Sequence, residues 1–306
     1  MSRAVQFESF GGALVVREVP EPQAGPGQIR VRVTAAGLNP MDWFMTSDAA
    51  TAARFGLSLP CGFGTDYAGV VDQVGDGVTG FATGERVFGG AMSRAVADHV
   101  LIDVDGTIAK GGDAHRTPEG IDDRTAAVLT IGGCTAAAAL AVVRPGPGDT
   151  VLIGGAGGGV GVFAVQLARR AGARVIGTGS ASSADALRVL GAEPVTYGDG
   201  LADRVRALAP GGITAAMDLH GTDTAHTARA LGVPDARITT IAAVVPGITP
   251  ANGASAAPGA IEEIASLIAA GELRVPIAAS FPVEEVGAGL ELQAGRHVHG
   301  KVVIEL

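Results

Sequence analysis

The chain reads Thr150-Val151-Leu152-Ile153-Gly154-Gly155-Ala156-Gly157-Gly158-Gly159-Val160-Gly161 near its middle, an apolar run that passes into glycines and then into an apolar helical segment. A strand that turns directly into a helix needs small residues at the turn, because the backbone must pack closely and approach a ligand. The spacing Ala156-x-Gly158-x-x-Gly161 differs at one position from the glycine pattern that binds a dinucleotide pyrophosphate. Free N–H groups at a helix start also favour phosphate. The stretch therefore predicts dinucleotide binding through Ala156, Gly158, Gly159, Val160 and Gly161.

A second predicted strand ends in Val175-Ile176-Gly177-Thr178-Gly179-Ser180. Enzymes that use NAD usually carry Asp or Glu at this point, where the carboxylate binds the ribose 2′-hydroxyl. No acidic residue occurs here before Asp185, whereas serine hydroxyls can donate to a 2′-phosphate. The pattern favours NADPH, with contacts from Thr178, Ser180 and Ser183. Arg188 is either a further phosphate contact or a solvated helix residue.

Strand and helix patterns alternate through the second half of the chain. The predicted strands cover residues 151–153, 174–177, 215–219 and 238–244, and the predicted helices cover residues 160–171, 183–190 and 201–209. Such alternation predicts a doubly wound parallel α/β sheet of the Rossmann type. The Pro/Gly/Ala-rich residues 246–260 predict a loop, residues 261–270 an amphipathic helix, and the closing residues 302–306 a strand.

The first part of the chain has a different pattern, with many short alternating runs separated by glycine and proline. Gln28–Val33 is the clearest strand, and several short strands of this kind predict a compact β barrel or sandwich. The pattern changes at Thr117-Pro118-Glu119, which predicts a helix start with a Thr cap and Pro in the first turn. An alanine-rich helical stretch over residues 121–143 follows, broken at Gly132-Gly133.

The composition limits the possible partners. The chain has 306 residues, 47% of them hydrophobic, and a net charge of −9, which argues against general nucleic-acid binding. No apolar run is long enough to span a membrane, and the start lacks a signal-peptide pattern, so we expect a cytoplasmic protein with a small-molecule substrate. The two cysteines, Cys61 and Cys134, are expected to be small buried residues rather than a disulfide.

Several motifs along the chain together carry a resemblance to one protein family. They are Ala35-Ala36-Gly37-Leu38-Asn39-Pro40-Met41-Asp42-Trp43, Gly64-Thr65-Asp66-Tyr67-Ala68-Gly69-Val70-Val71, Gly133-Cys134-Thr135-Ala136, Leu190-Gly191-Ala192 and Gly300-Lys301-Val302-Val303. With these motifs in this order, the chain resembles the medium-chain dehydrogenase/reductase superfamily, in its zinc-independent quinone oxidoreductase and enoyl reductase branch. The resemblance implies a GroES-like β-barrel domain at residues 1–116, an NADPH-binding Rossmann domain at 117–271, and a C-terminal segment at 272–306 that completes the first domain. Relatives are commonly homodimers, which makes a homodimer possible here.

The residue types also indicate whether the chain can bind zinc. Gly64-Thr65-Asp66 stands where the zinc-bearing relatives have Gly-His-Glu, and only Cys61 lies nearby. Too few soft ligands remain for a tetrahedral site, so we predict no metal. His297 and His299 are expected at the surface, since their spacing alone is too weak a pattern for a metal site.

The resemblance implies a set of site residues. Asn39 matches a residue near the nicotinamide and substrate, Thr135 matches one that holds the nicotinamide end, and Lys301 matches one near the cofactor. Ile241 and Ala242 follow a strand that normally lines the nicotinamide. Tyr197 and His220 are further expected cofactor contacts, His220 because it follows a predicted strand at the cofactor-facing edge.

The chain departs from the family where many quinone oxidoreductases carry Tyr-x-Arg, because it has Phe44-Met45-Thr46 instead. We expect a more apolar pocket, with Trp43 and Phe44 at its wall and Met45 and Phe63 as further candidates. Tyr67 is either a proton donor or a core residue, and Asp42 and Asp66 are expected to be structural.

These patterns favour an NADPH-dependent reductase that transfers hydride to an activated C=C bond of a quinone, an enone or a biosynthetic intermediate. Two alternatives remain open. One is an imine or carbonyl reductase on the same scaffold. The other is a non-catalytic NADPH-binding sensor, which the missing Tyr-x-Arg pattern favours slightly.

Overall fold

The structure is a computed structural model that describes residues 1–295 and 298–306. His297 therefore lies outside the described residues. The chain divides into two compact units. The first unit comprises Met1–Ile131, Ile268–Ala270 and Ile277–Leu306, and the second comprises Gly132–Leu267 and Gly271–Pro276.

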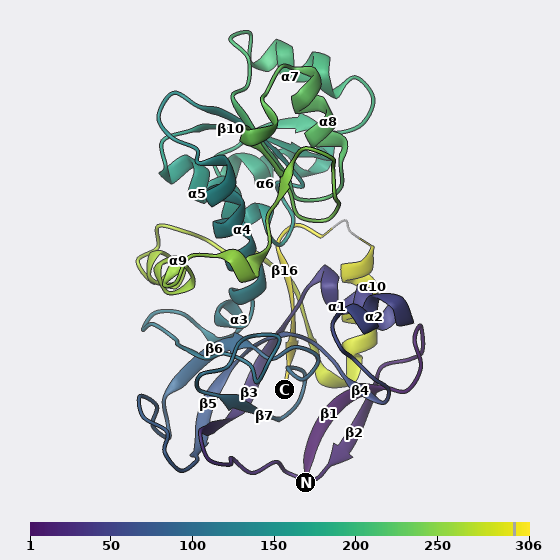
Figure 1. The fold of residues 1–306 in the computed structure, drawn as a ribbon, viewed down its shortest axis with the longest axis vertical. Coiled ribbons are helices and arrows are strands. Elements are labelled where there is room, and N and C mark those ends of the chain that lie inside the picture. Colours follow the sequence, from purple (N-terminus) through teal and green to yellow (C-terminus); the bar gives the residue numbers. More distant parts are fainter. Residues whose placement is uncertain (296–297) are drawn as a thin grey trace. The chain divides into compact units, whose positions relative to one another are not determined.

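The second unit contains a parallel sheet of six strands in the order β11-β10-β9-β12-β13-β14 (Figure 1). The strands are β9 (Thr150–Gly154), β10 (Arg174–Gly179), β11 (Glu193–Thr196), β12 (Ala215–Asp218), β13 (Ile238–Thr240) and β14 (Thr249–Pro250). Numbered within the sheet, this is the order 3-2-1-4-5-6 of a Rossmann fold. The strand order reverses between β9 and β12, so the ligand crevice is expected just beyond the carboxyl end of β9. The predicted doubly wound sheet is confirmed.

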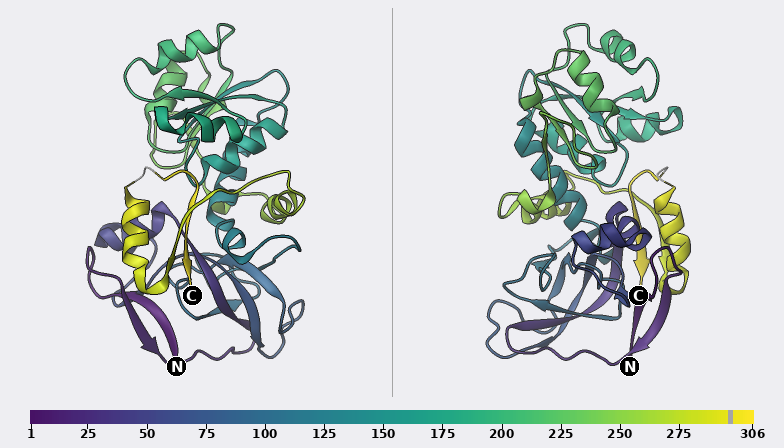
Figure 2. Two further views of the ribbon diagram at one scale, coloured as in Figure 1. Left: turned by 180° about the vertical axis from the view of Figure 1, so that it is seen from behind. Right: turned by 45° about the vertical axis from the view of Figure 1, so that its right-hand side comes forward.

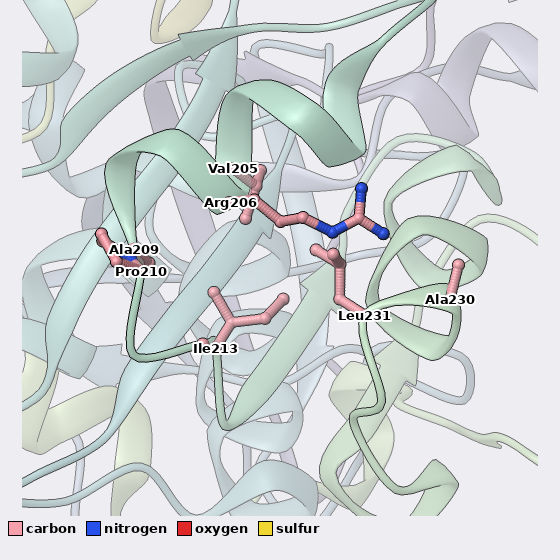
Figure 3. Close-up of a pocket in the computed structure, with 8 residues that line it drawn as sticks. Val205, Arg206, Ala209, Pro210, Ile213, Ala230 and Leu231 are labelled. Atoms are coloured by element: carbon pink, nitrogen blue, oxygen red, sulfur yellow. The ribbon is translucent and has the colours of Figure 1, made fainter.

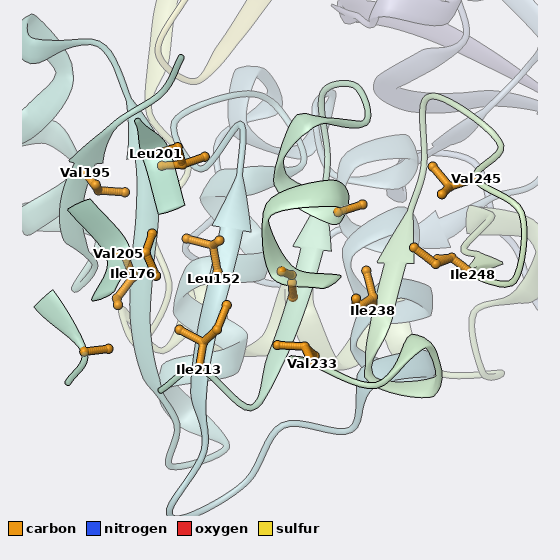
Figure 4. Close-up of a cluster of buried hydrophobic side chains, with 14 residues drawn as sticks. Leu152, Ile176, Val195, Leu201, Val205, Ile213, Val233, Ile238, Val245 and Ile248 are labelled. Atoms are coloured by element: carbon orange, nitrogen blue, oxygen red, sulfur yellow. The ribbon is translucent and has the colours of Figure 1, made fainter. Parts of the chain in front are cut away.

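The strands of this sheet are apolar on both faces, and helices pack against them. These helices are α5 (Gly161–Arg170), α6 (Ala184–Val189), α7 (Leu201–Leu208) and α8 (Asp223–Ala230). The second unit also holds most of α4 (Thr130–Val143) and α9 (Ala260–Ala269), which pack on each other, and short 3₁₀ turns at Ala181–Ser183, Asp235–Arg237 and Gly253–Ser255. One core cluster joins strand residues to α7 and α8 (Figure 4). Leu152, Ile176 and Ile238 lie on the strands of this cluster, and Leu201 and Val205 pack against them from α7.

The first unit is mostly antiparallel β structure. Its strands are β1 (Ser2–Phe7), β2 (Val15–Val19), β3 (Gln28–Leu38), β4 (Cys61–Gly62), β5 (Asp66–Val74), β6 (Arg86–Gly90), β7 (His99–Asp103), β8 (His115–Arg116), β15 (Ile277–Pro282) and β16 (Lys301–Glu305). The long strand β3 pairs with β5, β7 and β16, so the C-terminal strand completes the sheet that the N-terminal half begins (Figures 1 and 2). Its helices are α1 (Pro40–Ser47), α2 (Ala49–Arg54), α3 (Asp123–Ala126) and α10 (Val286–Ala294), with a 3₁₀ turn at Val283–Glu285.

Two helix predictions for residues 117–143 were wrong. No helix starts at Thr117-Pro118; Gly120 adopts a φ of +91°, and α3 begins at Asp123, where the Asp122 carboxylate accepts a bond from the Thr125 amide. Helix α4 runs straight through Gly132-Gly133. A Cβ at Gly132 would lie 2.7 Å from the carbonyl oxygen of Gly159, so this glycine permits close packing rather than ending the helix.

The first unit also extends past the expected boundary at residue 116. Helix α3 packs on β3, β5 and β6, and its Asp123 carboxylate accepts bonds from Thr34 on β3 and from the Arg86 guanidinium on β6. In the second unit, β13 ends at Thr240 instead of residue 244, since the Thr240 hydroxyl donates to the Ala243 carbonyl and turns the chain. The expected loop at 246–260 carries the short edge strand β14. Along the described chain, no helix is long and apolar enough to cross a membrane.

The glycine turn packs tightly against its neighbouring strand. Ala156 is fully buried, and a Cβ at Gly177 of β10 would lie 2.8 Å from the Ala156 Cβ and 3.1 Å from the Ala192 Cβ. Real Cβ contacts are longer than this, so Ala156 can replace a glycine here only because Gly177 has no side chain.

We expect Gly177→Ala to destabilise the protein by about 1–3 kcal/mol through overpacking, as measured by urea unfolding. Adding Ala156→Gly should recover most of that loss, because it removes the methyl group that the new Cβ meets. Gly211→Ala is the matched control, since nothing lies within 4 Å of its Cβ position. A double variant no more stable than Gly177→Ala alone would contradict the packing argument.

Candidate functional site

The glycine loop after β9 closes on itself through backbone contacts. Gly155 has a φ of +67°, and its carbonyl oxygen accepts a bond of 3.0 Å from the Gly158 amide. A Cβ at Gly161 would overlap the carbonyl oxygens of Gly155 and Ala156, so only glycine fits at the first residue of α5. A Cβ at Gly158 would meet only the Gly155 oxygen, at 3.3 Å, and otherwise faces open space.

The loop leaves three consecutive amides available. Within the described residues, the N–H groups of Gly159, Val160 and Gly161 have no hydrogen-bond acceptor, and the four residues from Gly157 to Val160 are half-buried. The first N–H groups of a helix lack intrahelical partners and lie at the positive end of the helix dipole. They fit the pyrophosphate of a dinucleotide, and Gly158 gives a phosphate room to approach.

The turn after β12 lies next to this loop and is held by a buried carboxylate. Asp218 accepts bonds from the amides of His220, Gly221, Thr224 and Ala225, at 2.8–3.2 Å. These bonds fix His220 beside the loop, where its Cβ would lie 3.1 Å from a Cβ at Gly155. His220 is exposed and follows β12 at the carboxyl edge of the sheet.

The end of β10 carries hydroxyl groups and no carboxylate. Thr178 is buried, and its hydroxyl oxygen accepts a bond from the Gly155 amide, so this side chain holds the glycine loop to the end of β10. Ser183 is also buried and donates to the Ser180 carbonyl. The hydroxyls of Ser180 and Ser182 lie 2.9 Å apart near the surface. Ser180 is therefore the accessible member of the predicted set, and Ser182 is an exposed hydroxyl beside it.

Three other predicted cofactor contacts of the second unit, Tyr197, Ile241 and Ala242, follow the carboxyl ends of its strands. Tyr197 follows β11, is 57% exposed, and donates its amide to the Gly179 carbonyl. Ile241 and Ala242 follow β13, half-buried and exposed respectively. Thr135 lies in the second turn of α4, where its hydroxyl would be 3.0 Å from a Cβ at Gly253. Arg188 pairs with Asp185 at 2.6 Å and is solvated.

A buried polar cluster lies in the first unit, around the predicted residues Asn39 and Lys301. The Lys301 ammonium donates to Asn39 Oδ1 at 2.6 Å and lies 3.9 Å from Asp66 Oδ2. Asn39 Nδ2 donates to Asp66 Oδ2 at 3.0 Å, and the Ile131 amide donates to the same carboxylate. Asp42 caps α1, because its carboxylate accepts bonds from the Asn39 amide and from the Thr65 hydroxyl.

Burial changes the proton affinity of this cluster. Burial raises the pKa of Asp42 to about 6 and that of Asp66 to about 7, although hydrogen bonds and the nearby ammonium oppose the change. Burial also lowers the pKa of Lys301, against the attraction of the two carboxylates. Lys301 is only 3% exposed, so one ammonium and two carboxylates share a space that water does not reach.

The aromatic residues predicted for the substrate pocket separate into two groups. Trp43 and Phe44 lie on α1 with ring centroids 4.6 Å apart, and Phe44 is 39% exposed. Met45 and Phe63 are buried in the core of the first unit, each 2% exposed. Tyr67 is fully buried and donates to the Asp113 carbonyl, and burial raises the pKa of its phenol well above 10. Of the two roles considered for Tyr67, its surroundings fit the core role.

Among residues 1–295 and 298–306, no three His, Cys, Asp or Glu side chains come together as a group that could hold a metal ion. Asp66 and Thr65, which stand at the ligand positions of zinc-bearing relatives, are bonded within the buried cluster.

Comparison with known proteins identifies the family. Residues 25–143 match the model of the alcohol dehydrogenase GroES-like domain, and residues 159–265 match that of the zinc-binding dehydrogenases. The chain belongs to the medium-chain dehydrogenase/reductase superfamily. Its relatives place it in the quinone oxidoreductase branch of that superfamily, and the predicted GroES-like and Rossmann domains are confirmed.

Individual relatives of this superfamily match the chain over different spans. The quinone oxidoreductase of Rattus norvegicus is 35% identical over 185 residues, which are 58% of this chain and 53% of that protein. The spectinabilin polyketide synthase system protein NorB of Streptomyces orinoci is 40% identical over 188 residues, 59% of this chain and 8% of that protein. The chain thus spans about half the length of the curated quinone oxidoreductases it matches. The solved quinone oxidoreductase of Coxiella burnetii has a TM-score of 0.85 at 27% identity, covering 100% of this chain and 99% of that one.

Two residues that hold turns of the second unit were not predicted from the sequence: Asp218 holds the turn beside the glycine loop, and Arg204 donates to the carbonyls of residues 196–199. Asp218 is the last residue of β12, and an acid between a strand and a helix start is a recognisable signal for a carboxylate that caps backbone amides. Arg204 lies inside an ordinary amphipathic helix, and nothing in its local pattern separates it from the solvated arginines nearby.

The buried cluster predicts a pH dependence of stability. Asp42 and Asp66 have a pKa of about 6 and 7 when folded, against 3.8 in the unfolded chain. Between about pH 4 and 7 the folded protein holds more protons than the unfolded chain, so these groups stabilise it fully at low pH. The free energy of unfolding should fall as the pH rises from about 4 to 7, by up to about 1.4 kcal/mol per pH unit for each proton.

Asp66→Asn removes one of the two titrating groups and should make this decline clearly shallower, as measured by urea unfolding at several pH values. The slope, rather than the absolute stability, is the readout, because the substitution also alters bonds to Asn39 and Ile131. Asp185→Asn, an exposed carboxylate in a surface ion pair, is the control and should leave the slope unchanged. Equal slopes in wild type and Asp66→Asn would refute the assignment.

Proposed function

We propose that the protein is an NADPH-dependent reductase that acts on an activated C=C bond, as in a quinone, an enone or a biosynthetic intermediate. One observation carries the proposal: three unpaired amides of the glycine loop stand at the switch point of the sheet, beside a β10 that ends without a carboxylate. NADPH, when bound, supplies the hydride. The residues of this chain would bind the cofactor, orient the substrate and stabilise the negative charge that develops on the substrate oxygen.

The second unit would hold the cofactor at its carboxyl edge. The amides of Gly159, Val160 and Gly161 would bind the pyrophosphate, and Gly158 lets the phosphates approach the backbone. The hydroxyls of Ser180 and Ser182 can donate to a 2′-phosphate, and no acid at the end of β10 repels it. The preference for NADPH over NADH is part of this proposal.

The first unit would act on the substrate. Addition to a conjugated double bond places negative charge on the substrate oxygen, where hydrogen-bond donors stabilise it. The Asn39 amide keeps one N–H beyond its bond to Asp66, and Lys301 fixes the other end of that amide. Trp43 and Phe44 present aromatic rings suited to an apolar, planar substrate. The α-carbon then takes a proton from water or a side chain.

We propose that this reaction needs no zinc. The positions at which zinc-bearing relatives carry His and Glu hold Thr65 and Asp66, and both side chains are bonded within the buried cluster. Burial also raises the pKa of the Cys61 thiol, which favours the neutral form over the thiolate that binds metals.

The activity is tested by following NADPH oxidation at 340 nm with a panel of quinones, enones and enoyl thioesters. We expect turnover on at least one of these classes and a much higher kcat/KM with NADPH than with NADH. Turnover of imines or simple carbonyls alone would select that alternative reaction. Tight NADPH binding without turnover on any panel would support a sensor.

Gly158→Val should leave the protein folded but abolish NADPH binding, because the added side chain occupies the space through which the phosphates approach. Binding is measured by the fluorescence of NADPH, and folding by circular dichroism. Gly211→Val, at a position with nothing within 4 Å, should bind as wild type does. Retained affinity in a folded Gly158→Val protein would count against the loop assignment.

The purified protein should contain far less than one zinc per chain by elemental analysis, and its activity should survive dialysis against a chelator. Added zinc should not raise the rate. Stoichiometric zinc together with chelator-sensitive turnover would overturn the zinc-free mechanism while leaving the cofactor site intact.

A further inference from the structure

The connection between β11 and α7 wraps around one guanidinium. Arg204 donates to the carbonyl oxygens of four consecutive residues: Nε to Thr196 at 3.1 Å, Nη2 to Tyr197 at 3.2 Å and to Gly198 at 3.0 Å, and Nη1 to Asp199 at 2.7 Å. A guanidinium has five N–H groups in a rigid fork, so this side chain uses four of them on one short segment.

Such an arrangement requires an unusual backbone. Four consecutive carbonyls can face one point only where the chain curls, and Gly198 and Gly200 supply φ values of +88° and +76° that favour glycine. In the part of the chain that the structure describes, Arg204 has no carboxylate within ion-pair distance, whereas Arg206 on the same helix pairs with Asp203 at 2.6 Å. The role of Arg204 is therefore to fix the backbone of residues 196–199.

The fixed segment presents an aromatic ring beside the end of β10. Gly179 and Thr196 are partners in the parallel register, and the Tyr197 amide donates to the Gly179 carbonyl at 3.3 Å. Tyr197 is 57% exposed, and its backbone is bonded to Gly179, which Ser180 follows. In a sheet of this order, the end of the second strand is where the adenosine ribose of a dinucleotide binds.

We propose that Arg204 is a positioning residue for the adenosine 2′-phosphate end of NADPH and acts through Tyr197. The clamp holds the backbone so that the tyrosine ring offers its face to the purine. This end of the cofactor needs such support, because the predicted basic contact after β10, Arg188, is engaged with Asp185. The inference rests on the proposed function.

The experiment compares ligands that contain and lack the adenosine end. The affinity of 2′,5′-ADP, measured by calorimetry, should fall about tenfold in Arg204→Gln and nearly as much in Arg204→Lys, because an ammonium cannot span four carbonyls. KM for NADPH should rise similarly with kcat little changed. KM for reduced nicotinamide mononucleotide, which lacks adenosine, should stay at the wild-type value.

Arg206→Gln is the matched control, since it makes the same charge change on the same helix. Its side chain lines a pocket of about 280 Å³ with Ile213 and Leu231 (Figure 3). Ile213 precedes β12, so this pocket lies at the amino edge of the sheet, opposite the glycine loop. All three ligands should bind Arg206→Gln as they bind wild type.

A double-mutant cycle tests whether Arg204 acts through the ring. Tyr197→Ala should weaken 2′,5′-ADP, and adding Arg204→Gln should weaken it little further. Additive losses, or a wild-type affinity in Arg204→Lys, would overturn the positioning role. If Arg204→Gln does not fold, Arg204→Lys and the exposed-site variant Tyr197→Ala still decide the question. A wild-type protein that binds no NADPH overturns the proposed function as well, whereas unchanged 2′,5′-ADP binding in the Arg204 variants overturns this inference alone.

Discussion

The carbonyl oxygen of Gly155 lies so close to the Cα of Gly161 that no side chain fits between them. This backbone contact makes α5 begin directly at the end of β9 and aims the first amides of the helix beyond the edge of the sheet. Because β9 is the central strand at which the order reverses, those amides stand at the one place in the sheet where a crevice is expected. The neighbouring turn, held by Asp218, closes around the same point. The candidate cofactor site follows from this single contact.

The first unit holds charged groups in an interior that water does not reach. Lys301 and Asp66 approach each other only to 3.9 Å, and Asn39 lies between them as donor to one and acceptor from the other. An amide in this position cannot rotate without breaking both bonds, so the cluster fixes the start of α1. Burial penalises every charge in the cluster, and the raised pKa values of Asp42 and Asp66 record that penalty. The same penalty argues that the cluster is retained for orientation rather than stability.

Local patterns were sufficient for the architecture, because strand, turn and helix at residues 150–161 are specified by neighbours in sequence. They failed where a distant contact decides. Gly132 resembles a helix breaker, yet it packs on the carbonyl of Gly159, a residue distant from it in the sequence. Met45 and Phe63 resemble pocket residues, yet both face the core. Ser183 and Thr178 were correctly placed near the end of β10, but only the structure shows that their hydroxyls are committed to the backbone.

Arginine composition explains why Arg204 could not be recognised from the sequence. The chain has 22 basic residues, all but Lys110 and Lys301 of them arginines, so no single arginine stands out. Other arginines of the second unit pair with an acid on the surface, as Arg188 and Arg206 do, and such pairs contribute little to stability. Arg204 differs because its partners are peptide carbonyls, which carry no charge and leave no trace in the pattern of acidic residues. A guanidinium bound this way loses its bonds as a group, since moving the segment 196–199 breaks four at once. The turn that carries Tyr197 is therefore held by the Arg204 side chain, in addition to the single bond from the Tyr197 amide to Gly179 of β10.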